Sequence, residues 1–143
     1  MTIEEKEKAM LKKIMLSIED AAHVMDGAIA EAKKNKWPVA IAIVDDGGHL
    51  LQFARLDGTP PASAYIAPEK ARTAALGRRE TKVYEDMINQ GRSAFLSAPL
   101  QGMLEGGVPI LVDGQVVGAV GVSGVKSAED AQVAKAGVAA LGR

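Results

Sequence analysis

Residues 69–73, with the sequence EKART, bring four polar side chains into about one and a half turns of a predicted helix. Glu69 and Thr73 are four residues apart and share a helix face. Lys70 and Thr73 are three residues apart and can together meet a carboxylate. The pattern fits either a solvated helix surface or the polar wall of a cleft. In the cleft interpretation, Glu69 and Lys70 are the candidate catalytic residues.

Further candidates for anion binding lie outside this helix. Arg55 ends a predicted strand beside a proline-rich loop, where its guanidinium can bind an anion or pair with Asp45 or Asp57. Two consecutive glycines at 106–107 allow close backbone approach and have N–H groups to donate. We therefore expect a carboxylate-binding cleft whose ligand-binding residues are Arg55, Lys70, Thr73, Gly106 and Gly107.

Imidazole chemistry is restricted to two histidines, which are far apart in the sequence. His23 lies on the polar side of a predicted helix, and His49 follows a Gly-Gly turn. Two such residues make no metal-binding motif, so no metal site is expected. Each is either an ordinary exposed histidine or a haem axial ligand, since haem needs only one proximal histidine. No Gly-x-Ser-x-Gly elbow is present.

Composition limits the class of protein. The 143 residues fit one domain, and 48% of them are apolar, while aromatic residues make up only 3%. A formal net charge of −1 gives no electrostatic footprint for nucleic acid or an anionic membrane. The absence of cysteine excludes thiol catalysis and disulfides. No stretch resembles a membrane span or a signal peptide, so a cytoplasmic location is expected.

The first half of the chain predicts a helix followed by a hairpin. Ser17 begins a capping-box pattern, and apolar residues then recur at helical spacing until Pro38 prevents continuation. Residues 39–45 predict a strand with both faces apolar and therefore covered. A turn at 46–48 leads to a returning strand over 49–56.

The middle of the chain predicts two helices and an irregular segment. Because proline is disfavoured inside a helix, we expect the main helix over 68–76 with a looser turn before Pro68. Thr81 is expected to cap a short helix over 82–90 that Gly91 ends. Residues 92–105 are expected to be irregular.

A second hairpin and a last helix complete the domain. Strands are expected over 108–112 and 116–123, joined by a tight turn at Asp113-Gly114. Gly118 and Gly121 fall inside the second strand and predict close approach by a helix, a partner subunit or a ligand. Ser127 begins another capping-box pattern and is expected to open the last helix. Two hairpins flanking a helical segment favour an α/β domain of the α+β type, with a mainly antiparallel sheet covered by helices.

The order of these motifs resembles that of the GlcG/HbpS-like family, which includes haem-binding proteins and the C-terminal domain of PduO-type proteins. The resemblance rests on VAIAIVDDGGHLLQFARLDG, EKARTAA, EGGVPILVDGQVVGAVGVSG and SAEDAQVAKAGVAAL. It implies a central sheet of about five strands, oligomers built from dimers, and binding of haem or a corrinoid in some members. The first residues of the chain are dense in Glu and Lys, so we expect a charged extension over 1–15 and a single GlcG/HbpS-like domain over 16–143.

Three functions remain open at this point. The first is a cytoplasmic small-molecule-binding protein with haem or a related tetrapyrrole as ligand, His23 or His49 being its axial candidates. The second is an enzyme of organic-acid or aromatic catabolism that acts on a small carboxylated substrate. The third is a non-catalytic accessory subunit.

Overall fold

Two antiparallel hairpins join into one sheet in the computed structural model, which describes residues 1–142. The end of the predicted domain, position 143, lies outside these residues. The first hairpin consists of β1 (Ala40–Asp45) and β2 (Leu50–Arg55), and the second of β3 (Gly107–Val112) and β4 (Gln115–Ser123). Antiparallel pairing of β1 with β4 gives the order β2-β1-β4-β3. The α+β class is confirmed, with four strands among the described residues where about five were expected.

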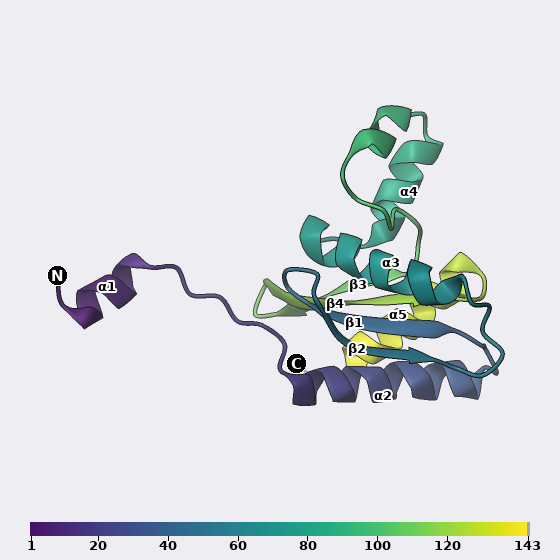
Figure 1. The fold of residues 1–143 in the computed structure, drawn as a ribbon, viewed down its shortest axis with the longest axis horizontal. Helices are drawn as coiled ribbons and strands as arrows, with labels where there is room; N and C mark the ends of the chain where they lie inside the picture. The colour runs from purple at the N-terminus through teal and green to yellow at the C-terminus, as the bar shows by residue number, and fades with distance from the viewer. Residues whose placement is uncertain (143) are drawn as a thin grey trace.

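Helices cover both faces of this sheet (Figure 1). Helices α2 (Ile18–Lys34) and α5 (Ser127–Ala140) lie on one face, and α3 (Ser63–Gly77) lies on the other. Helix α4 (Thr81–Asn89) and the short 3₁₀ helix η1 (Ser93–Ser97) project beyond α3, away from the sheet. At the N-terminus, α1 (Ile3–Ala9) stands apart from the domain at the end of an extended arm.

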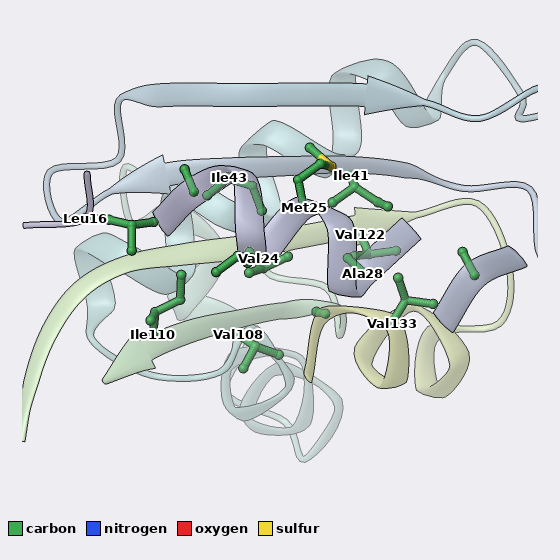
Figure 2. Packing of buried hydrophobic residues seen from close by; sticks show 14 of the residues in the cluster. Leu16, Val24, Met25, Ala28, Ile41, Ile43, Val108, Ile110, Val122 and Val133 are labelled. Carbon is green, nitrogen blue, oxygen red and sulfur yellow. The ribbon is translucent and has the colours of Figure 1, made fainter. Parts of the chain in front are cut away.

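Alternation along β1 builds two different cores. Ile41 and Ile43 face α2 and α5, where Figure 2 shows them among aliphatic side chains such as Val24 and Val122. Ala40 and Ala42 face α3 in a second cluster made largely of alanine. The expectation that both faces of this strand are covered is therefore confirmed.

The second core is thin because α3 lies very close to β4. A Cβ atom added to Gly121 would lie 2.1 Å from the carbonyl oxygen of Ala67 and 2.4 Å from the backbone nitrogen of Ala71. Glycine is therefore required where the helix backbone meets the strand. Of the alternatives that the sequence left open, a packed helix explains Gly121.

Helix α3 begins earlier than expected. It starts at Ser63 and continues through Pro68, whereas the sequence predicted a start at Pro68. Pro68 is the sixth helical residue, so its missing N–H removes only the bond that would reach the carbonyl of Ala64. The preceding turn is held by backbone bonds such as Ile66 N–H to the Ala62 oxygen, 3.1 Å.

The structure confirms the predicted N-cap of α2 but not those of α4 and α5. Ser17 precedes α2, and its Oγ accepts a hydrogen bond from the Asp20 N–H at 3.1 Å, as expected. Thr81 is the first residue of α4 and does not cap it, because its hydroxyl binds the 104–107 segment instead. Ser127 is likewise the first residue of α5, one position later than a cap, and Glu129 accepts from the Lys126 N–H at 3.2 Å.

The turn of the second hairpin has the predicted geometry. Asp113 has φ 50° and Gly114 has φ 75°, between the paired residues Val112 and Gln115. Two successive residues with positive φ form the turn type that matches the twist of an antiparallel pair.

Candidate functional site

The Lys70 ammonium lies in the interior of the protein, between α3, β4 and α5. Lys70 is 3% exposed, and its Nζ donates to the Val122 carbonyl oxygen at 2.9 Å and to Asp130 Oδ2 at 3.2 Å. Asp130 Oδ1 also accepts from the Val125 N–H at 3.2 Å. This buried ion pair connects α3 and α5 to the end of β4. The ammonium and the carboxylate are paired with each other.

The pKa of Asp130 is shifted upward by this environment. Burial of the carboxyl raises the pKa, because removal from water disfavours the charged form. The Lys70 ammonium and the Val125 N–H act in the opposite direction and offset only part of the effect.

Thr73, Gly106 and Gly107 are buried beside this pair. Thr73 Oγ1 accepts from the Gly102 N–H at 3.0 Å, and Thr81 Oγ1 accepts from the Gly107 N–H at 2.8 Å. A Cβ atom on Gly107 would lie 2.4 Å from the Lys70 carbonyl oxygen. The α3 backbone therefore approaches Gly107 closely, while Gly106 lies against the Val122 carbonyl oxygen and the Lys70 ammonium.

Arg55 lies in a different place, at the exposed end of β2. It lines an open groove of about 580 Å³ between the C-terminal end of α2 and the loop after β2. Other groups that line it are Lys33, Lys36, Trp37, Pro38 and Asp57. Lys70 and Thr73 do not line this groove, so the structure separates Arg55 from the helix residues with which it was grouped. Glu69 is half-buried on α3.

The groove residues on α2 were missed because lysines near a helix C-terminus are expected from the helix dipole alone. A signal was present in the sequence. Lys36, Trp37 and Pro38 follow one another directly after the helix, combining a cation with the single tryptophan of the chain.

His49 projects from the β1–β2 turn, where Asp45 holds it. Its Nδ1 lies 3.2 Å from Asp45 Oδ1, while 82% of the side chain is exposed. In the tautomer with hydrogen on Nδ1, this N–H donates to the carboxylate and Nε2 is left free. Burial raises the pKa of Asp45, but the N–H groups of His49 and Gly47 outweigh burial and hold this pKa below its ordinary value.

His23 occupies the exposed face of α2. His23 therefore projects from α2, whereas His49 projects from the turn between β1 and β2. In residues 1–142, no group of three or more His, Asp or Glu side chains could hold a metal ion. Within the same residues, no helix is long and apolar enough to cross a membrane.

Comparison with known proteins gives relatives that match most of the chain. Protein GlcG of Escherichia coli strain K12 is 59% identical over 114 residues, which are 80% of this chain and 85% of that protein. A crystal structure of a double mutant of Streptomyces reticuli HbpS is 30% identical, with a TM-score of 0.84 over 94% of this chain and 92% of that one.

A third relative was crystallised with a ligand. The structure titled PduOC:Heme Complex is 26% identical to this chain, with a TM-score of 0.79 over 89% of this chain and 95% of that one. The family model described as haem degrading protein HbpS-like matches residues 16–139. This match spans the whole sheet and all but the last residue of the helices that cover it. The chain therefore belongs to the HbpS-like family.

Proposed function

We propose that the protein binds haem or a related tetrapyrrole, with His49 Nε2 as the axial ligand. The observation that carries the proposal is the pairing of His49 with Asp45, which leaves Nε2 free on a ring that is 82% exposed. Histidines that ligate metals almost always donate their other ring N–H to a carboxylate, a carbonyl or water. His23 has no comparable carboxylate contact within residues 1–142.

The surroundings of His49 fit a flat apolar ligand with acidic groups. Leu50 and Phe53 are 55% and 39% exposed, and they pair with Val44 and Ala42, whose side chains lie on the α3 face. Residues directly opposite on paired strands point to the same face, so both apolar side chains lie there. Arg72 of α3 is exposed and its side chain lies against Gly48, next to His49.

Each of these residues has its own role in the proposed binding. Leu50 and Phe53 supply an apolar surface for the ring, and the Arg72 guanidinium is placed to receive a propionate carboxylate. A bound haem would supply an iron centre for ligand binding or electron transfer. The haem complex of PduOC, a family member 26% identical to this chain, supports haem as the first ligand to test. A corrinoid is the second.

Titration of the full-length protein with haem, followed by the Soret band, tests the proposal. His49→Ala should abolish the shifted Soret band, and Asp45→Asn should weaken binding about 10–100-fold, the usual effect of losing a partner of a metal ligand. His23→Ala is the matched control and should bind as the wild type does. Unchanged binding by His49→Ala, with loss in His23→Ala, would assign the axial role to α2 and overturn the proposal.

The same surface supports assembly into a homo-oligomer built from dimers. Strand β2 is an edge strand with exposed Leu50 and Phe53, and Tyr65 and Leu76 of α3 are also exposed, at 79% and 42%. An exposed edge with apolar side chains is a ready site for association. A second copy of the chain would cover it and shield a bound tetrapyrrole. Light scattering that gave a 14.9 kDa species at micromolar concentration would contradict this assembly.

A further inference from the structure

We propose that the groove between α2 and the end of β2 is a second binding site, one that takes organic carboxylates with a flat aromatic body. The groove encloses about 580 Å³ and is formed by two segments, the C-terminal end of α2 and the residues from Arg55 to Gly58. It lies at the opposite end of β2 from His49. The inference does not rest on the proposed haem site.

The net charge of the groove is positive. Lys33, Lys36 and Arg55 line it together with a single carboxylate, Asp57. Within the part of the chain that the structure describes, none of the three cations takes part in an ion pair, whereas Lys70 and Lys13 each have a carboxylate partner. Arginine binds a carboxylate with two parallel N–H groups, so Arg55 is the natural primary contact.

The groove also has an apolar lining, which the α2–α5 core holds in place. Trp37 is half-buried and packs against the α2–α5 core, and Leu56 packs against the same core. Pro38 and Ala32 complete this apolar lining. An inorganic anion would use only the cations, and an uncharged apolar molecule would leave them unpaired. A planar aromatic acid uses both the indole face and the cationic rim.

The way α2 ends fixes Lys36 on the groove wall. Lys36 has φ 59°, a left-handed conformation that glycine adopts far more readily at this position of a helix terminus. The Trp37 N–H bonds to the Ala32 oxygen at 2.9 Å, and the Lys36 N–H bonds to the Lys33 oxygen at 3.1 Å, which completes the capping motif. A cation thus occupies a strained position on the groove wall, beside Trp37.

The single tryptophan makes the proposal directly measurable. In a ¹⁵N-labelled full-length protein, the Trp37 indole gives one cross-peak, which should shift saturably when 2-naphthoate is added. Arg55→Gln should weaken this binding about tenfold or more, because a charge-assisted hydrogen bond is lost. Arg92→Gln, at an exposed arginine between α4 and η1 and outside the groove, is the matched control and should leave the titration unchanged.

Two further probes and one haem titration separate the alternatives. Binding of 2-naphthamide as tight as that of 2-naphthoate would overturn the requirement for an anion. Binding of inorganic phosphate as tight as that of 2-naphthoate would overturn the role of the apolar wall. Absence of any indole shift at millimolar 2-naphthoate would overturn the site itself. If Arg55→Gln also abolished haem binding, the groove would belong to the tetrapyrrole site and its separate ligand would be disproved, whereas retained haem binding supports two sites.

Discussion

The cations of this protein are used in two opposite ways, which a comparison of the Lys70 region with the Arg55 groove makes clear. Lys70 is 3% exposed and bonded to a strand carbonyl and a carboxylate, so its charge holds the fold together. Lys33, Lys36 and Arg55 line an open groove and have no ion-pair partner within residues 1–142. A charged side chain that has lost its hydration must be paired, whereas one that remains hydrated is available to a ligand. Burial, and not residue type, therefore decides which cations remain available to a ligand.

The largest effect is expected from breaking the buried pair. Lys70→Ala leaves the Asp130 carboxyl buried without its partner and should lower the free energy of unfolding by about 3–5 kcal/mol in urea titrations. Lys33→Ala, in the groove, should change it by less than about 0.5 kcal/mol. Equal losses in the free energy of unfolding for the two substitutions would contradict the distinction between a structural Lys70 and a hydrated Lys33. The double variant Lys70→Met with Asp130→Leu should recover most of the loss, since no unpaired charge remains.

A smaller loss is expected where α3 approaches the sheet. Gly121→Ala places a Cβ atom 2.1 Å from the Ala67 carbonyl oxygen, and because backbone atoms cannot yield as a side chain can, we expect a loss of about 1–3 kcal/mol. Gly47→Ala is the control, because its nearest neighbour is the exposed His49 ring at 3.0 Å. Thermal unfolding of both variants measures the difference. A Gly121→Ala protein as stable as the wild type would show that α3 shifts freely and that its contacts do not hold the Lys70 region rigid.

The second hairpin turn tests backbone strain in the absence of packing. Gly114 has φ 75°, and a Cβ atom there would meet no atom within 4 Å. Gly114→Val should still cost about 1 kcal/mol or more, since a β-branched residue at positive φ is strained. Gln115→Val, one residue later in β4, should be tolerated. An unchanged melting temperature in Gly114→Val would argue against the turn.

The smallest effect is expected at the exposed β1–β2 turn, as a dependence of stability on pH. The pKa of Asp45 is lowered in the folded protein, so its carboxylate stabilises the fold above its unfolded pKa of about 3.9 and this contribution is lost as the pH falls through the folded value. The stability advantage of wild type over Asp45→Asn should therefore be full at pH 7 and shrink below about pH 4, remaining under about 1 kcal/mol. Melting temperatures between pH 3 and 7 measure it. A constant difference across this range would contradict the assignment, and Asp57→Asn serves as the exposed control.

Most elements of the fold follow from local patterns in the sequence. The strands over 40–45 and 115–123 agree with prediction within one residue, because alternation and the Asp113-Gly114 turn are local properties. The helix from Ser17 follows from its cap and its apolar spacing. The start of α3 did not follow, because the tolerance of Pro68 depends on a preceding turn stabilised by its own backbone bonds.

For the candidate site, too, some features follow from the sequence and others only from the tertiary structure. Composition and local pattern alone determined the two histidines, the cationic and glycine-rich segments, and the absence of cysteine. Only the tertiary structure decided that Lys70 meets Asp130, 60 residues later, and that Arg55 meets the end of α2. The EKART segment shows helical spacing, but spacing cannot say which face another element covers. That outcome depends on long-range pairing of β1 with β4, which brings α3 and α5 to one strand end and buries the lysine between them.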